Sequence, residues 1–151
     1  MEIKPFHFKD NESIIELLSN CSPYVVPHHP YVYWIMSQYF PSLNLAAWED
    51  GKIVGFVCAL HSIEKDNVFV WQLAIDHAYR QTGVALKLCD KIIQYAEDHK
   101  VSSLQLTISD QNAASLSFFT KLAAQKGKQI EKIEMDGLEV FENESAYEIK
   151  L

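Results

Sequence analysis

The chain has 151 residues, of which 48% are hydrophobic and 12% aromatic, so it can bury a core of its own and is not a disordered segment. Its 20 acidic and 13 basic residues give a formal net charge of -7, which disfavours nucleic acid and anionic membranes as main partners, because both bind positive surfaces. No apolar run approaches the roughly 20 residues of a membrane-spanning helix.

The N-terminus and the cysteines indicate the compartment. The segment Met1–Pro5 lacks the basic and then apolar layout of a signal peptide. Cys21, Cys58 and Cys89 are an odd, widely spaced set without metal-ligand spacing, so we expect free thiols and no metal site. These features predict a cytoplasmic protein. The lack of linkers and repeats predicts a single domain over residues 1–151.

The first 61 residues predict a strand, two helices and a hairpin, in that order. Asp10 or Asn11 can cap the first helix, a loop with three prolines follows it, and Pro41 ends the second helix. The pair Asp50-Gly51 between two apolar runs is a hairpin turn signal. The expected elements are a strand over 3–8, helices over 11–18 and 31–40, and strands over 43–48 and 53–61.

The rest of the chain predicts alternating strands and helices. The strand over 68–75 is apolar on both faces and is expected to lie centrally in the sheet. Further helices are expected over 83–99 and 112–124, and further strands over 104–108, 129–133 and 147–151. The order β-α-α-β-β-β-α-β-α-β-β predicts a mixed α/β sheet with helices on both faces.

A strand that runs through a polar turn directly into a helix is the most informative feature of the chain. Gly83 lets the backbone approach a ligand, and the free N–H groups of the first helical turn point into that space. Such amides and the helix dipole favour a phosphate. Arg80 could contact it or be a solvated turn residue. The residues expected to hold a pyrophosphate-bearing cofactor, unless this is an ordinary turn, are Gln81, Thr82, Gly83, Val84, Ala85 and Leu86.

The element order and the motif Arg80-x-x-Gly83-x-Ala85 resemble the GNAT superfamily of N-acetyltransferases. The resemblance implies the GNAT acyl-CoA N-acyltransferase fold, with acetyl-CoA as cosubstrate and its pyrophosphate in this turn. It implies that the strand ending Leu73-Ala74-Ile75 splays from its neighbour and pairs with the pantetheine arm. The amide of Leu73 would then polarise the thioester carbonyl. Asn112, which can also be a plain helix cap, would bond the same arm, close to Ser115 and Phe119.

The proton donor of this superfamily is often a tyrosine seven residues after that asparagine. Phe119 stands at that position and cannot donate a proton. A water, or the proton of the incoming ammonium, would have to serve instead. Direct attack in a ternary complex is expected, because no reactive Cys/His pair suggests an acyl-enzyme.

A second resemblance, to the diaminobutyrate acetyltransferases of ectoine synthesis, covers the larger part of the chain. It implies a primary amine of a small amino-acid-like metabolite as acceptor, and a homodimer. The segments that carry it are Phe69-Val70-Trp71-Gln72-Leu73-Ala74-Ile75, Leu106-Thr107-Ile108-x-x-x-Asn112-x-Ala114-Ser115-x-x-x-Phe119-x-x-Leu122-Ala123, Tyr31-Val32-Tyr33 and Glu144-Ser145-Ala146-Tyr147-Glu148-Ile149.

Two residues are the main candidates for acceptor binding and, with Leu73, for catalysis. Trp71 interrupts an apolar strand beside the cofactor arm, although it could equally be a core aromatic. Glu144 would supply the counter-charge that an amine needs, or would be a solvated charge. Tyr31 and Tyr33 could line the acceptor pocket or only pack their helix.

The loop before the tyrosine pair departs from the second family. Its members carry Asp-x-Asn-Ser there, whereas this chain reads Val26-Pro27-His28-His29, which leaves the acceptor's identity open. His28 and His29 could deprotonate an amine near neutral pH, and His29 is expected to contact the substrate; either could also be merely exposed. Two further functions stay open, namely the same fold acting on a polyamine, an antibiotic amine or a protein N-terminus, and a CoA-binding sensor without turnover.

Overall fold

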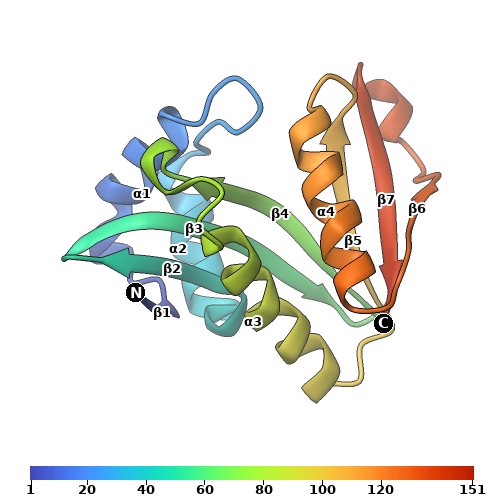
Figure 1. Ribbon diagram of the computed structural model, residues 1–151, viewed down its shortest axis with the longest axis horizontal. Helices are drawn as coiled ribbons and strands as arrows, with labels where there is room; N and C mark the ends of the chain where they lie inside the picture. Colours follow the sequence, from blue (N-terminus) through green and yellow to red (C-terminus); the bar gives the residue numbers. More distant parts are fainter.

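The computed structural model describes residues 1–151 and shows one seven-stranded sheet and four α-helices (Figure 1). The strands are β1 (Glu2–Pro5), β2 (Asn44–Glu49), β3 (Lys52–Ser62), β4 (Asn67–Ile75), β5 (Ser103–Ser109), β6 (Ile130–Ile133) and β7 (Glu144–Lys150). The helices are α1 (Asn11–Ser19), α2 (Pro30–Tyr39), α3 (Val84–Asp98) and α4 (Ala113–Gln125). Short 3-10 helices occur at η1 (Phe8–Asp10), η2 (Pro41–Leu43), η3 (His77–Tyr79) and η4 (Leu138–Val140). This order confirms the predicted mixed α/β architecture.

The first and last strands each differ from the prediction by three residues at one end and by one residue at the other. Strand β1 stops at Pro5, because Phe6 turns into the core and residues 8–10 form η1. Strand β7 begins at Glu144 rather than at Tyr147, because Glu144 and Ser145 pair with the end of β5. Polar residues paired in this way carry no apolar alternation that a sequence pattern could reveal.

The sheet splits where β4 leaves β5. The strand order is β1-β2-β3-β4-β5-β7-β6, and β4 pairs with β5 in parallel. This pairing joins residues 67–70 to residues 103–106, and both strands continue beyond it (Figure 1). The predicted splaying of the strand that ends at Ile75 is confirmed. One edge of β4 is left without a partner strand.

Strand β4 contains a β-bulge at Trp71. Gln72 pairs with Cys58 of β3 and Val70 pairs with Ala59, so Trp71 is an extra residue with no counterpart on β3. The regular alternation of side chains between the two faces of β4 is therefore interrupted at Trp71. Val70 belongs to one core cluster and Ala74 to the other, although regular alternation would put both on the same face.

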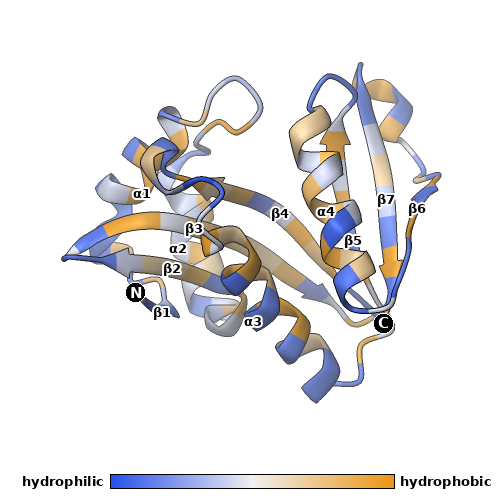
Figure 2. Ribbon diagram, in the orientation of Figure 1, coloured by the Kyte–Doolittle hydropathy of each residue, from blue (hydrophilic) through white to orange (hydrophobic).

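Helices cover both faces of the sheet, as predicted. A cluster of 22 buried residues lies under α3 and α4, and a cluster of 12 lies under α1 and α2. Figure 2 shows the apolar residues concentrated in the central strands. The second cluster contains no residue of β5, β6 or β7, so α1 and α2 cover only the half of the sheet formed by β1 to β4. The three cysteines are free and buried, which confirms the expected free thiols.

None of the helices combines the length and the apolar character that crossing a bilayer would need.

Candidate functional site

The unpaired edge of β4 presents the backbone of Leu73 and Ile75 to the gap. Along an antiparallel pair, residues that hydrogen-bond the partner strand alternate with residues that face away from it. The N–H of Asp76 donates to the carbonyl of Val54 on β3 (2.9 Å), so in the same register Ala74 also faces β3. Leu73 and Ile75 therefore direct their N–H groups to the side that β5 has left. Ala74, also predicted to touch the cofactor, offers it no backbone hydrogen bond and has a buried side chain.

The turn after β4 is held by short-range hydrogen bonds. The Asp76 carboxylate accepts from the Ala78 N–H (2.9 Å) and from Lys52 Nζ (3.2 Å), and these two groups lower the pKa of Asp76. Arg80 Nε donates to the Ile75 carbonyl (3.4 Å), which folds the guanidinium back over the end of the strand.

Backbone amides converge where this turn enters α3. Gln81 and Gly83 have positive φ values of 61° and 90°, a conformation that glycine adopts without strain. The N–H groups of Gln81, Thr82 and Gly83 donate to no group in the chain. The N–H groups of Val84, Ala85 and Leu86 are also unpaired, because the first helical hydrogen bond of α3 is donated by the N–H of Lys87. A β-carbon on Gly83 would meet nothing within 4 Å, so the space above these amides is open. We call this set of amides, residues 81–86, the amide cradle.

The start of α4 borders the other side of the gap, because it follows β5. Asn112 caps this helix by accepting from the Ser115 N–H (3.2 Å), which confirms the predicted cap. The backbone N–H of Asn112 donates to the Ser109 carbonyl (2.9 Å), whereas its side-chain Nδ2 has no partner in the chain and can donate to a ligand. Phe119 is only 4% exposed and lies in the core under α4, so it offers a cofactor very little contact surface.

A buried polar network connects the loop between α1 and α2 to β4. The Tyr33 hydroxyl donates to Gln72 Oε1 (2.9 Å) and accepts from the His28 N–H (2.9 Å). Gln72 Nε2 donates to the Val26 carbonyl (2.8 Å). Burial raises the pKa of Tyr33, so the hydroxyl keeps its proton. Sequence reasoning did not select Gln72, although one amide in an apolar strand signals that it has a buried partner.

The structure separates the roles of the two loop histidines. The ring of His28 lies against Trp71, with centroids 4.6 Å apart, and Trp71 is 39% exposed. His29 is the N-cap of α2, where its Nδ1 accepts from the Tyr31 N–H (3.2 Å). Tyr31 is 60% exposed and stacks on Trp34 on the outer side of α2, whereas Tyr33 is fully buried. Of the predicted acceptor contacts in this region, only Trp71 lies at the split of the sheet.

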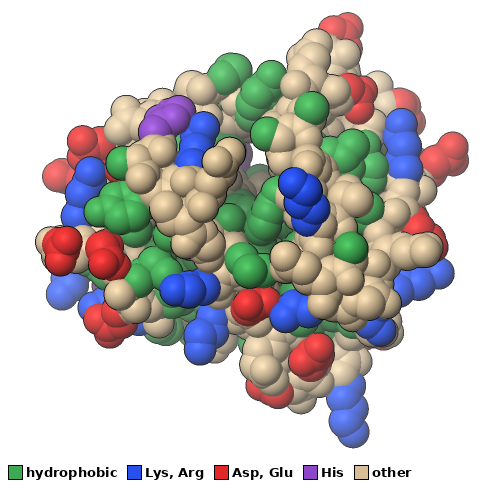
Figure 3. All heavy atoms as spheres, in the orientation of Figure 1, with side chains coloured by type: hydrophobic (Ala, Val, Ile, Leu, Met, Phe, Trp, Pro, Cys, Tyr) green, Lys and Arg blue, Asp and Glu red, His purple; other side chains and the backbone are tan.

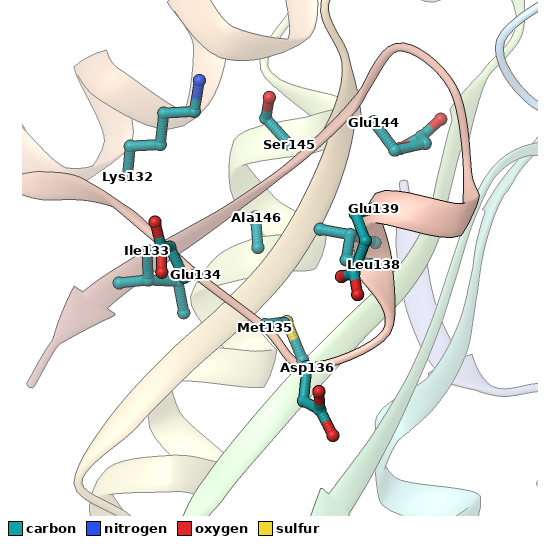
Figure 4. A pocket seen from close by; sticks show the side chains of 10 residues that line it. All are labelled: Lys132, Ile133, Glu134, Met135, Asp136, Leu138, Glu139, Glu144, Ser145 and Ala146. Carbon is teal, nitrogen blue, oxygen red and sulfur yellow. The ribbon is translucent and has the colours of Figure 1, made fainter.

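Glu144 lies on the same face of the sheet as α1 and α2. It pairs with Ser109 at the end of β5, next to Ser145, which pairs with the core residue Ile108. Alternation therefore directs the Glu144 side chain away from α3 and α4. It lines a cavity of ≈ 660 Å³ together with residues of β6 and of the β6–β7 loop (Figure 4). Four carboxylates and one ammonium line this cavity, contributed by Glu134, Asp136, Glu139, Glu144 and Lys132.

The two halves of the molecule approach each other again at the mouth of the split. The hydroxyl of Tyr24, in the α1–α2 loop, donates to the carbonyl of Gln111, in the β5–α4 loop (3.1 Å). On the side of α3 and α4, the surface is hollowed between the halves and hydrophobic side chains line the hollow (Figure 3). The gap is thus open to ligands from this side.

The sequence model of the acetyltransferase (GNAT) family matches residues 11–124. The L-2,4-diaminobutyric acid acetyltransferase of Nocardia farcinica is 35% identical over 119 residues, which are 78% of this chain and 62% of that protein. The protein of the same name from Halalkalibacterium halodurans is 34% identical over 113 residues, 74% of this chain and 60% of that one. The chain therefore spans about three fifths of the length of these relatives.

A solved structure covers nearly the whole chain. The diaminobutyrate acetyltransferase EctA from Paenibacillus lautus, in complex with its substrate L-2,4-diaminobutyric acid and coenzyme A, superposes with a TM-score of 0.88 at 26% identity. The match covers 99% of this chain and 93% of that one. The GNAT fold expected from the sequence is confirmed.

Proposed function

Because this chain belongs to the acetyltransferase (GNAT) family, we propose that it transfers the acetyl group of acetyl-CoA to a primary amine of a small, diaminobutyrate-like amino acid. The names of its relatives and the ligands of the Paenibacillus lautus enzyme support this substrate class. The observation that carries the proposal is the unpaired edge of β4, which lies next to the open amide cradle at the start of α3.

On the cofactor side, the amide cradle would hold the pyrophosphate, with Arg80 as a second contact. Unpaired amides at the start of a 15-residue helix favour an anion. Leu73 and Ile75 would bond the pantetheine arm as a missing strand would, and Asn112 would donate to the same arm. The Leu73 N–H faces the gap, where it would stabilise the oxyanion that forms on the thioester carbonyl.

On the acceptor side, Glu144 would pair with an ammonium group of the substrate, and Trp71 would border the reacting amine. The excess of carboxylates around Glu144 supports a cationic acceptor. His29, Tyr31 and Tyr33 remain candidates for acceptor contacts. Tyr33 would act through the loop that its hydroxyl holds, and Tyr31 and His29 through the first turn of α2.

The placement of the cradle and Glu144 on the two faces of the sheet supports direct transfer. The cradle lies at the start of α3 on one face, and Glu144 projects from the other. Donor and acceptor would thus meet in the gap from opposite sides, without an acyl-enzyme. The reaction leaves free coenzyme A thiol and an N-acetylated amine.

Release of the coenzyme A thiol from acetyl-CoA, measured across a panel of amines, tests the proposal. The panel contains L-2,4-diaminobutyric acid, other small diamino acids, a polyamine, an aminoglycoside and a peptide N-terminus. Release with one small diamino acid supports the proposal. Release only with another amine class would assign a different acceptor, and binding of acetyl-CoA without release on any amine would indicate a sensor.

We also propose that the protein is cytoplasmic and forms a homodimer. Its ligand would be a small amine, and it would bind neither nucleic acid nor a membrane. The free buried cysteines support a reducing compartment, and the net charge of -7 disfavours anionic partners. The dimer is expected from the resemblance to diaminobutyrate acetyltransferases. Light scattering after size exclusion would give twice the chain mass for a dimer and the single chain mass otherwise.

A further inference from the structure

We infer that His28 accepts the proton of the incoming ammonium group; this inference rests on the proposed function. Attack on a thioester requires a neutral amine, whereas an alkylamine is protonated near neutral pH. An imidazole is the side chain that accepts a proton in this range. The chain has six histidines, and only His28 has its ring against a residue of the split.

The position of His28 is the first argument. Its ring lies against Trp71, which is the first residue of β4 beyond the pairing with β5. The amide cradle begins α3, which packs on the opposite face of the sheet from α2. An acceptor that meets a thioester in the gap therefore approaches from the face of the α1–α2 loop, where His28 is found.

The way His28 is held is the second argument. Its backbone N–H donates to the buried Tyr33 hydroxyl, and Gln72 holds the carbonyl of Val26 two residues earlier. The half-buried ring itself takes part in no hydrogen bond or ion pair in the chain. The backbone is thus fixed, while both ring nitrogens are without a partner in the chain. His29 offers the contrast, because its Nδ1 is used to cap α2.

Among the side chains around His28, only the imidazole itself can accept a proton from an ammonium group. From α2 it faces the Tyr33 phenol, at 6.4 Å between ring centroids, and from β4 it faces Trp71, which does not ionise. Burial raises the pKa of Tyr33, which therefore stays neutral beside it. No carboxylate pairs with the ring.

The His28 imidazole takes one proton from the ammonium group, and the freed nitrogen lone pair forms a C–N bond to the thioester carbonyl carbon. Collapse of the tetrahedral intermediate breaks the C–S bond, and a second proton from the nitrogen ends on the departing thiolate. The imidazolium releases its proton to water, which restores the enzyme.

The test is the pH dependence of kcat/KM for L-2,4-diaminobutyric acid at saturating acetyl-CoA, in the wild type and in His28→Gln. Glutamine keeps a polar side chain but cannot accept a proton. We expect kcat/KM to fall about 10²-fold at pH 7, through kcat more than KM. The deficit should shrink towards pH 10, where an alkylamine loses its proton unaided.

His29→Asn is the matched control, because asparagine is also a good N-cap and the change removes the neighbouring imidazole. Because His29 remains a candidate acceptor contact, any loss in this variant should fall on KM for the acceptor, and the pH profile of kcat/KM should keep the shape of the wild type. A His28→Gln deficit that is equal at all pH values, or no deficit, would overturn the role of His28 while leaving acetyl transfer intact. Failure of the wild-type protein to release thiol with any amine of the panel would instead overturn the proposed function, and this inference with it.

Discussion

Gly55 lies directly beneath Val84. A β-carbon built on Gly55 of β3 would be 2.8 Å from Val84 Cγ1 and 3.1 Å from Leu88 Cδ1, so the first turn of α3 packs on bare backbone. The position of the amide cradle therefore depends on the absence of a side chain on a strand that contributes nothing else to it.

Gly55→Ala should displace the start of α3. We expect the free energy of unfolding to fall by about 1–3 kcal/mol, as for other overpacked cores, and the affinity for coenzyme A to fall as well. Urea denaturation and calorimetric titration measure the two effects. Gly127→Ala is the control, because Gly127 has a positive φ of 68° and no close neighbour. It should cost stability but leave the affinity unchanged, and equal losses of affinity in both variants would contradict this explanation.

Gly83→Glu tests the amide cradle itself, with Gly83→Gln as its isosteric partner. Both substitutions force a side chain into a φ of 90°, so both carry the same backbone strain. Only glutamate brings a negative charge to the proposed phosphate position. Near 4 Å that repulsion is at least about 1 kcal/mol, which corresponds to a further loss of coenzyme A affinity of at least about fivefold. Identical affinities in the two variants would remove the phosphate from this turn.

Glu144→Gln should raise KM for the acceptor at least about tenfold, as expected when a charge-assisted hydrogen bond worth about 1.5–3 kcal/mol is lost. The affinity for coenzyme A should not change. Glu142→Gln is the control, because Glu142 is an exposed carboxylate two residues earlier. Steady-state kinetics with the acceptor varied distinguish the two. An unchanged KM in Glu144→Gln would make Glu144 a surface charge.

Tyr33→Phe tests the buried network. It leaves the His28 N–H and Gln72 Oε1 without the Tyr33 hydroxyl, and an unsatisfied buried group costs about 1–3 kcal/mol. We therefore expect that loss in the free energy of unfolding, together with a higher KM for the acceptor because the loop is no longer held on β4. Coenzyme A binding should be preserved. A phenylalanine variant with wild-type stability would mean that water replaces the hydroxyl.

The Cys58 thiol links stability to alkaline pH. Burial raises its pKa to about 12, whereas an unfolded cysteine titrates near 8.5. The unfolded chain therefore loses this proton first, and the stability from the buried thiol is complete below pH ~8.5 and falls as the pH rises towards 12. Between pH 8.5 and 10 the wild type should lose about 1.6 kcal/mol more than Cys58→Ala. Urea denaturation at the two pH values measures this, and equal losses would refute it.

Local patterns were sufficient for most elements and for the turn whose unpaired amides open α3. The glycine turn before an apolar helical stripe, the Asp50-Gly51 hairpin and the Asn112 cap are all short-range signals, because neighbouring residues decide them. The splayed strand was expected from the family resemblance alone. Nothing in the apolar run of β4 distinguishes the part that pairs with β5 from the part that does not.

The acceptor side depends on contacts between distant segments. Which of His28 and His29 faces β4 is decided by Tyr33 and Gln72, and the cavity at Glu144 is completed by a loop without a periodic pattern. The bulge at Trp71 is defined by how β4 pairs with β3, whose residue Ala59 lies 12 residues before Trp71 in the chain. The composition of β4 therefore does not reveal it.

The bulge at Trp71 lies where the pairing of β4 with β5 ends. Removing Trp71 would let Gln72 follow Val70 in an even ladder, with every later residue still opposite its present neighbour on β3. The strand would lose the added twist that a bulge brings, and the pairing that now stops at Val70 and Leu106 could run on to the end of β5. The surplus residue thus marks the point at which the continuous sheet ends and the opening begins.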